Sequence, residues 1–419
     1  MNEMEQLERM CAAVPPPDRQ RLAPARAQLI TAITGSRRLA ASHAARGPWP
    51  AISLKLRRRW LGWAAPLAAA AAVVGVILGT QGVFSTVHSP APGPSGHGRG
   101  VGLSHPVTAY VAGQSGTVTP ILTATNTALA PIRIGKGPDA EQNSCAIAFL
   151  PDGKTAYVLT NTLAGGPGTV TPIRTATNTA LAPITVGQDP RAFAITPDGK
   201  TIYVTNYQSG TVTPIRTATN TALAPIKVGR DPWPIAITPD GSTAYVLNNG
   251  PGTVTPIRTA TNTALAPIKV PEGSFSMTIT PDGTTVYVLD LGSSQDKEGM
   301  VIPIRTATNT ALRPIPIGPA WPFVITIAIT PDSKTAYVTN AHTDTVTPIR
   351  TATNTALAPI NVGESPLAIA ITRDGKTAYV VFGSGPSRPG IVIPIQTATN
   401  QALRPIQVGY LPGTIAITP

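Results

Sequence analysis

The chain is poor in the residues that usually build covalent or metal-stabilised sites. Its 419 residues include two cysteines and five histidines, and aromatic residues make up only 5%. Cys11 and Cys145 show no C-x-x-C, haem-attachment or zinc-ligand spacing, so no disulfide framework and no metal site is expected. No G-x-S-x-G elbow occurs, and no cofactor-binding motif is present. These absences argue against common hydrolytic and metal-dependent catalysis.

Acidic residues are also scarce, with 20 Asp and Glu against 32 Lys and Arg. The basic excess is uneven. Residues 1–59 carry eleven Lys/Arg and four Asp/Glu, whereas residues 107–419 carry twenty and sixteen. A nucleic-acid-binding protein is expected to carry its basic surface on the folded domain itself. The distribution therefore predicts no nucleic-acid partner.

Charge is missing altogether from residues 60–84, WLGWAAPLAAAAAVVGVILGTQGVF. This run is long enough to cross a hydrocarbon core of about 30 Å, and Lys55 and Arg57–Arg59 stand immediately before it. The positive-inside rule then places residues 1–59 in the cytoplasm. A cleaved signal peptide and a buried soluble helix are the alternatives, but the upstream segment is too long for a signal peptide. We expect one transmembrane helix at 60–84.

The segments on either side of this run differ in composition. Residues 1–13 and 18–34 are predicted to form two short helices in the cytoplasmic segment, separated by Pro15–Pro17. Residues 85–106 are rich in Pro, Gly and Ser and are predicted to form an extended linker. We therefore expect a single-pass membrane protein whose residues 107–419 lie outside the cytoplasm.

The remainder of the chain is repetitive. The phrase T-A-T-N-x-A-L-x-P-I occurs seven times, with its asparagines at 126, 178, 220, 262, 309, 354 and 400. Successive asparagines are 52, 42, 42, 47, 45 and 46 residues apart. A period in the low forties is typical of a blade of four short strands. The sequence therefore predicts an all-β, seven-bladed β-propeller of four-stranded blades at residues 107–419.

One copy shows the four expected strands most clearly. They are bounded by turn residues and rich in β-branched side chains, and they cover Pro234–Thr238, Thr243–Leu247, Thr253–Thr259 and Ala264–Val270. Pro256 falls inside the third strand, where proline removes a ladder hydrogen bond. We expect either a bulge at this position or a nitrogen that points away from the neighbouring strand.

The two ends of the repeat region complement each other. Residues 414–419 (TIAITP) have the pattern of a first strand with no second strand after it. Residues 105–111 (HPVTAYV) have the pattern of a second strand with no first strand before it. Together they are predicted to complete a seventh blade, so that the last strand latches the fold and leaves only short edges exposed.

The phrases carried by these strands resemble the YVTN family of β-propeller repeats. They include Tyr203-Val204-Thr205-Asn206, Tyr337-Val338-Thr339-Asn340, I-x-x-T-P-D-G and G-T-V-T-P-I-x-T-A-T-N. The resemblance covers residues 107–419 and implies a seven-bladed propeller, frequently extracytoplasmic and in cell-envelope proteins. It leaves activity open, because fold does not fix function. The N-terminal part resembles actinobacterial membrane proteins, some of them similar to anti-sigma regulators, although the zinc-binding spacing of such regulators is absent.

The copies diverge at one end of the predicted blades. Loop lengths vary only in the connections between second and third strands and between successive blades, at 162–168, 291–299, 383–390, 135–144 and 318–324. The residue just before the first strand also differs in every copy: Cys145, Arg191, Trp233, Phe275, Ile325, Leu367 and Gly413. Variable loops gathered on one face are expected of a binding surface. We refer to this end as the variable face.

The candidate ligand-binding residues follow from this divergence. Aromatic and arginine side chains at an exposed rim are typical anchors for a partner. The candidates on the variable face are Arg191, Trp233, Phe275, Ile325, Trp321, Leu367, Asp189 and Asp231. The alternative is that these side chains plug the channel or pack on adjacent loops. The repeated Pro-Asp-Gly and Thr-Ala-Thr-Asn turns at the other end are expected to be structural.

Catalytic and metal-binding alternatives depend on few residues. His342 lies in a loop beside Asp344 and is the one candidate general base in the repeat region. Asp189, Asp231 and Glu364 approach one end from separate blades, as calcium ligands would, but Arg191 and Arg230 beside them favour ordinary ion pairs.

Three functions are therefore compared. The expected one is a noncatalytic binding or scaffold module for a protein or cell-envelope polymer, with no catalytic residue and no cofactor. The first alternative is a transmembrane regulator in which residues 1–59 bind a cytoplasmic partner. The second is a lactonase- or lyase-like propeller enzyme.

Overall fold

The computed structural model describes residues 108–113, 116–134, 142–162, 166–292, 298–319, 326–363, 365–382 and 389–410. Every described residue belongs to one compact unit of the chain, Pro66–Pro419. The described part is all β: its regular elements are strands, and it contains no helix long and apolar enough to cross a membrane. The predicted cytoplasmic segment, transmembrane helix and linker (1–59, 60–84 and 85–106) lie outside the described residues.

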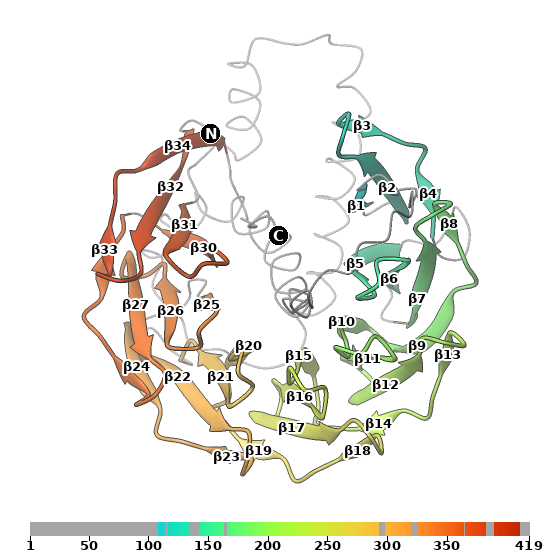
Figure 1. Cartoon of the computed structure of the whole chain (residues 1–419). Coiled ribbons are helices and arrows are strands. Elements are labelled where there is room, and N and C mark those ends of the chain that lie inside the picture. Colours follow the sequence, from blue (N-terminus) through green and yellow to red (C-terminus); the bar gives the residue numbers. More distant parts are fainter. Residues whose placement is uncertain are drawn as a thin grey trace, which may run out of the picture. The chain divides into compact units, whose positions relative to one another are not determined.

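The strands form seven antiparallel sheets, which we number as blades 1 to 7 in chain order (Figure 1). Blade 1 contains β1 (Thr108–Gly113), β2 (Thr117–Leu122), β3 (Thr127–Ala128) and β4 (Ile132–Arg133). Blade 2 contains β5 (Gln142–Phe149), β6 (Thr155–Thr162), β7 (Pro167–Arg174), β8 (Thr179–Ala180) and β9 (Ile184–Gln188). Blade 3 contains β10 (Pro190–Ile195), β11 (Thr201–Asn206), β12 (Thr211–Arg216), β13 (Thr221–Ala222) and β14 (Ile226–Lys227).

The remaining blades repeat this order. Blade 4 contains β15 (Pro232–Ile237), β16 (Thr243–Asn248), β17 (Thr253–Arg258), β18 (Thr263–Ala264) and β19 (Ile268–Lys269). Blade 5 contains β20 (Ser274–Ile279), β21 (Thr285–Asp290), β22 (Glu298–Arg305), β23 (Thr310–Ala311) and β24 (Ile315–Pro319). Blade 6 contains β25 (Ile327–Ile329), β26 (Thr335–Asn340), β27 (Thr345–Arg350), β28 (Thr355–Ala356) and β29 (Ile360–Asn361). Blade 7 contains β30 (Pro366–Ile371), β31 (Thr377–Phe382), β32 (Pro389–Gln396), β33 (Gln401–Ala402) and β34 (Ile406–Tyr410).

Each of blades 2 to 7 has three full strands paired in chain order. The fourth place is shared by two short strands that both pair with the third, as β13 and β14 do with β12. The expected continuous strand Ala264–Val270 is therefore wrong: Leu265-Ala266-Pro267 interrupts it. The first described strand of blade 1 has the register of a second strand, as predicted, because β1 pairs with β2 as β11 pairs with β12.

The interruption of the fourth strand explains the proline inside the third. Tyr245 lies opposite Pro256 with no shift of register between β16 and β17, so no bulge forms there. The carbonyl of Pro256 accepts a hydrogen bond from Leu265 N at 2.8 Å. The nitrogen of a strand residue faces the same side as its carbonyl, so the missing donor faces the gap in the fourth strand. All seven blades repeat this Leu-to-Pro bond, from Leu129 to Leu403.

The hydrophobic core lies between the blades, not within them. Six clusters of buried side chains each draw on two consecutive blades, from the pair 1 and 2 to the pair 6 and 7. Between blades 3 and 4, for example, Tyr203 and Ile226 pack against Ile235 and Val246. This packing explains why apolar residues occupy both faces of the central strands, since each of blades 2 to 6 is covered on two sides.

A repeated polar contact joins the same boundaries. In blades 1 to 6 the tyrosine of the second strand donates a hydrogen bond to the asparagine Oδ1 of the next blade, and five of these bonds are 2.6 to 2.7 Å long. The sixth joins Tyr110 to Asn178. Each accepting asparagine has a positive φ, such as 53° at Asn262, which asparagine tolerates better than most residues. The Thr-Ala-Thr-Asn phrase thus both turns the chain and fastens one blade to the next.

Candidate binding surface

The loops that the sequence assigns to the variable face contact one another through backbone hydrogen bonds. Tyr207 N, just after the second strand of blade 3, donates to Asp189 O, just before the first strand, at 2.9 Å. Asn249 N makes the equivalent bond to Asp231 O in blade 4 at 3.1 Å. In blades 3 and 4 the loop between second and third strands therefore lies beside the connection that enters the blade. Much of the length variation falls at 135–141, 163–165, 293–297, 320–325 and 383–388, outside the described residues.

The divergent position before the first strand coincides with a β-bulge. In blade 3, Pro190 pairs with Asn206 and Ala192 with Thr205, so Arg191 is an extra residue with no partner across the ladder. The same shift of register frees the equivalent residues of blades 2, 5 and 7, namely Cys145, Phe275 and Leu367, and a related shift occurs around Trp233 in blade 4. Bulges are over-represented next to functional sites because they redirect a side chain without breaking the sheet.

Arg191 is the most constrained of these residues. Its Nη2 lies 2.8 Å from Oδ2 of Asp189, whose side chain is only 8% exposed. Its Cζ also lies 5.1 Å from the centre of the Tyr207 ring and 6.0 Å from that of Trp233, within the range of cation–π attraction. The guanidinium is therefore held by one carboxylate and two aromatic rings while 39% of the side chain stays exposed.

Trp233 links this cluster to the boundary between blades 3 and 4. The indole is partly buried against the core that the two blades share. Its carbonyl accepts a 2.9 Å hydrogen bond from Oγ1 of Thr205, which is fully buried and also accepts from Ala192 N beside the bulge. Sequence reasoning found Arg191, Asp189 and Trp233 but missed Tyr207. The position after the second strand also varies among the copies, and that signal could have identified it.

The other predicted residues are placed differently. Asp231 has the same left-handed backbone as Asp189, with φ of 55° and 48°. Trp233 has the position relative to Asp231 that Arg191 has relative to Asp189. Within the described residues, no hydrogen bond or ion pair to the Asp231 carboxylate is found. Its Oδ2 lies against Gly250, where an added Cβ would approach it to 2.6 Å. Phe275 is partly buried against the core between blades 5 and 6, as the packing alternative expects.

Three further candidates add little to the cluster. Leu367 is half-buried on β30. Trp321 and Ile325 lie outside the described residues. The structure therefore brings together Arg191, Asp189 and Trp233, with Asp231 one blade along, and it does not join Phe275 or Leu367 to them.

The proposed catalytic and calcium-binding residues are used structurally. Oδ1 of Asp344 accepts a 2.7 Å hydrogen bond from Ser365 N, so this carboxylate caps the connection into blade 7. The exposed His342 donates its backbone N–H to Asn340 Oδ1. Asp189 is paired with Arg191, and Glu364 lies outside the described residues. Within the part of the chain that the structure describes, no group of three His, Cys, Asp or Glu could hold a metal ion.

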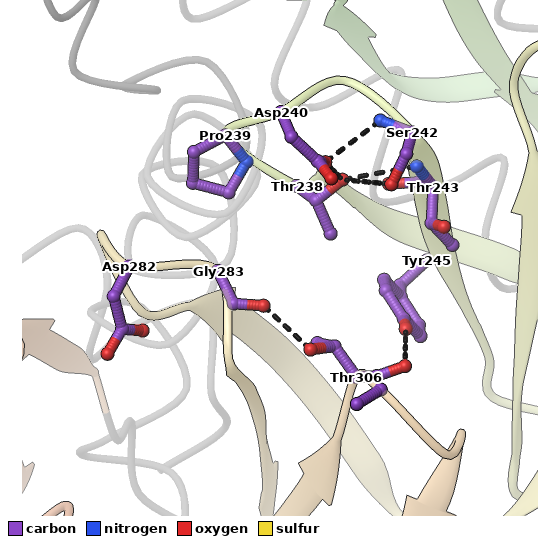
Figure 2. Close-up of a pocket in the computed structure, with 10 residues that line it drawn as sticks. Thr238, Pro239, Asp240, Ser242, Thr243, Tyr245, Asp282, Gly283 and Thr306 are labelled. Carbon is purple, nitrogen blue, oxygen red and sulfur yellow. Dashed lines mark hydrogen bonds between the residues drawn. The ribbon is translucent and has the colours of Figure 1, made fainter.

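The opposite end of the blades contains a small cavity of about 230 Å³ between blades 4 and 5 (Figure 2). Its polar groups bond to one another. Thr238 Oγ1 donates to Asp240 Oδ1 at 2.5 Å, and Ser242 N donates to the same oxygen at 3.0 Å. These bonds, led by that from Thr238, lower the pKa of the Asp240 carboxyl. Thr306 Oγ1 donates to Gly283 O at 2.7 Å. Because these bonds recur from blade to blade, this end has the structural role that was expected.

Comparisons with known proteins support the fold. No protein-family model matches the sequence, and no curated protein matches it. Among solved structures, the chain is similar to hydrazine synthase of Kuenenia stuttgartiensis, with a TM-score of 0.51, 20% identity, and coverage of 70% of this chain and 92% of that one. It is also similar to a protein from Bacteroides fragilis titled as a proposed 6-phosphogluconolactonase, with a TM-score of 0.50, 18% identity, and coverage of 75% and 98%.

A likeness at this level of identity shows the fold alone. The described residues are repeated four-stranded antiparallel sheets, as in a β-propeller, and seven such sheets are present in the part that the structure describes. The YVTN family itself is not shown, and it remains a resemblance of the repeated phrases. The names of the similar proteins include enzymes, so they do not decide between a binding module and a catalyst.

Proposed function

We propose that the chain is a membrane-anchored, extracytoplasmic propeller that acts as a noncatalytic binding module. Residues 60–84 form its anchor, residues 1–59 lie in the cytoplasm, and its ligand is a protein or an envelope polymer. The ligand binds the variable face around Arg191, Trp233, Asp231 and Asp189. One observation carries the proposal. The copies of the repeat have different residues at the β-bulges, where the extra residue has no partner across the ladder.

The geometry suits recognition of a ligand more than chemistry on it. Arg191 is held in one orientation by Asp189, Tyr207 and Trp233, so little side-chain entropy remains to be lost when a ligand binds. Arginine and aromatic residues that are ordered before binding are typical of interface hot spots. The Asp231 carboxylate adds an acceptor one blade along. Together they offer a donor fork, an acceptor and an aromatic edge on one surface.

The proposal is tested by crosslinking in intact membranes followed by a pull-down of the full chain. The wild type is compared with Trp233→Ala/Trp321→Ala and with Arg191→Ala. We expect the wild type to capture a discrete partner and both variants to lose it. Lys200→Ala is the matched control, because Lys200 is 81% exposed at the opposite end and pairs only with Asp198.

Three results would count against the proposal. Capture of the same partner by every variant would move the site away from the variable face. Turnover of a lactone by the purified chain, lost on His342→Ala, would favour the enzyme alternative. A specific partner retained by residues 1–59 alone would instead support the regulator alternative.

A further inference from the structure

The third strands of five consecutive blades end in an exposed arginine. In blade 3, Arg216 is the last residue of β12 and lies opposite Thr201, at the start of β11, and opposite Thr221 in β13. Its equivalents have the same register and are also exposed: Arg174, Arg258, Arg305 and Arg350. We call these five residues the arginine row. They lie at the end of the blades that carries the Pro-Asp-Gly and Thr-Ala-Thr-Asn turns, which we call the turn end.

The β-ladder does not account for the arginine row. Within the described residues, none of the five side chains makes an ion pair or a hydrogen bond. At the same register blade 7 has Gln396 and blade 1 has Leu122, and these two residues pair across the ladder as the arginines do. Because the ladder accepts glutamine and leucine at this position, a positive charge is not needed there for pairing.

The turn end as a whole has an excess of positive charge. Among the described residues, the Pro-Asp-Gly turns and their equivalents carry five Lys or Arg and six Asp, and the arginine row adds five further positive charges. Three of the aspartates are already paired with the lysine of their own turn, namely Lys200, Lys334 and Lys376. The variable face and the strand ends beside it carry six Asp or Glu and five Lys or Arg among the described residues. Most of the basic excess of the described blades therefore lies at the turn end.

The arginine row follows the blades without a break, because the turn ends of successive blades contact one another. Tyr203 of blade 3 donates to Asn262, in the turn that follows Arg258 of blade 4. The N–H of Asp282, in a turn of blade 5, donates to Ser333 Oγ in the equivalent turn of blade 6 at 2.9 Å. Exposed charges of one sign along a shared edge raise the local potential and attract a partner of the opposite sign. This edge therefore suits an extended anionic surface.

The chain enters the blades at the turn end. Thr108, the first residue of β1, lies opposite Leu122 at the end of β2, in the register that joins Thr201 to Arg216 in blade 3. In the sequence, 23 residues separate Thr108 from residue 84, where the proposed anchor ends. A chain of that length spans at most about 80 Å. The anchor would therefore hold the turn end, and not the variable face, nearer to the bilayer.

We propose that the turn end docks on the bilayer in which the chain is anchored, with the arginine row on the headgroups of anionic phospholipids. This inference rests on the membrane anchor of the proposed function and deepens it, because the variable face then points away from the bilayer and stays open to its ligand. Guanidinium groups suit phosphate oxygens, to which they donate two parallel hydrogen bonds. Each basic residue close to an anionic surface strengthens the attraction about fivefold, and the tether keeps the local concentration of lipid high.

Energy transfer in lipid nanodiscs tests the docking. The full chain, with Cys11 and Cys145 replaced by serine, carries one donor fluorophore on Ala218→Cys at the turn end or on Gln208→Cys at the variable face. Both positions are exposed and belong to blade 3. The discs contain an acceptor-labelled lipid in phosphatidylcholine alone or in an equal mixture with phosphatidylglycerol. We expect transfer from position 218 to exceed that from position 208, to rise in the anionic discs, and to lose this rise at high salt.

Two double variants in the same blades separate the arginine row from basic charge in general. Arg216→Gln/Arg258→Gln introduces the residue that blade 7 already has at this register. It should weaken the docking equilibrium in anionic discs about 25-fold, measured by a salt titration of the transfer, and leave the urea midpoint unchanged. Lys227→Gln/Lys269→Gln is the matched control, because these exposed lysines lie at the other end of the same third strands. The control should dock as the wild type does.

The results that would overturn the proposal are distinct from those that would contradict the proposed function. Equal transfer from position 218 in neutral and anionic discs, or equal losses in the two double variants, would overturn it. Capture of the wild type, but not of the arginine variant, on immobilised polyphosphate without any rise in anionic discs would assign the row to a soluble phosphate polymer and also overturn it. Release of the chain from membranes by alkaline carbonate would instead contradict the anchor, whereas a chain retained in the membrane without docking contradicts only this inference.

Discussion

The hydroxyl of Tyr203 donates a hydrogen bond to Asn262 Oδ1 across the boundary between blades 3 and 4, over a distance of 2.6 Å. The tyrosine is fully buried, and the asparagine accepts from within a left-handed turn, with φ of 53°. One residue of the repeat phrase therefore has two separable roles, which are to shape its own turn and to fasten the preceding blade.

The first prediction separates these two roles by substitution at Asn262. Asn262→Gly keeps the turn and loses the acceptor, so it should lower the free energy of unfolding by about 1 kcal/mol. Asn262→Ala also loses the acceptor and puts in the left-handed region a residue that tolerates it less well than asparagine or glycine, which adds a further ~1 kcal/mol. Urea unfolding measures both. Equal losses for the two variants would show that the turn geometry contributes nothing.

The second prediction concerns alkaline pH. Burial, reinforced by a nearby aspartate, raises the pKa to about 12 for Tyr157, Tyr203, Tyr245, Tyr287 and Tyr337. An unfolded tyrosine titrates near pH ~10. The unfolded chain therefore releases these protons first, so the stabilisation is complete below pH ~10 and is lost as the pH rises toward 12. Urea midpoints measured across this range should fall, and tyrosinate absorbance should rise together with unfolding. A flat midpoint would contradict the burial of these hydroxyls.

The third prediction concerns the carboxylate that positions Arg191. Asp189→Asn suits the positive φ of this position but removes the charge that the guanidinium contacts. We expect capture of the ligand to fall at least tenfold, while the melting temperature changes little. Asp198→Asn is the matched control, because its pair with Lys200 is exposed and such pairs contribute about 0–1 kcal/mol. Unchanged capture by Asp189→Asn would show that the orientation of Arg191 is irrelevant.

The fourth prediction concerns the hydroxyl beneath Trp233. Thr205→Val keeps the shape of the buried side chain but leaves Ala192 N and Trp233 O without this partner. The expected cost is about 1–3 kcal/mol, because Ala192 N stays buried and Trp233 O stays partly buried. Ligand capture should weaken as well, since the strand that carries Trp233 loses its anchor. Thr205→Ser should restore most of both properties. Failure of serine to restore them would point to packing, not to the hydrogen bonds.

The fold was predictable from the sequence because the repeat encodes it locally. In the copy for which strand bounds were predicted, periodic turns and β-branched runs placed the first three strands to within two residues of β15, β16 and β17. The fourth strand was predicted as continuous, because the pattern does not show that Leu265-Ala266-Pro267 leaves the ladder on the side that the nitrogen of Pro256 faces. That relation depends on which side of the strand each backbone group faces.

The candidate site was predictable only in part. Divergence among the copies identified Arg191 and Trp233, and adjacency in sequence suggested the pair of Arg191 with Asp189. Contacts between blades were not visible, because Tyr203 and Asn262 are 59 residues apart and nothing in either phrase indicates the other. Tyr207 was missed for a similar reason. Its contact with Arg191 forms where the loop after the second strand lies beside the connection into the first strand. Trp321 and Ile325 remain predictions.

The interrupted fourth strand also limits how one copy of the chain can associate with another. A fourth strand is the outer edge of its sheet, and a long unpaired edge is a template for aggregation. In blade 4 this edge offers only Thr263–Ala264 and Ile268–Lys269, separated by a segment that ends in Pro267. Seven nearly identical blades with continuous fourth strands would otherwise present seven such edges. The proline at Pro267 and at its equivalents therefore shortens the edge that another strand could pair with. It lies on the outermost strand, where the absence of a backbone N–H costs the sheet least.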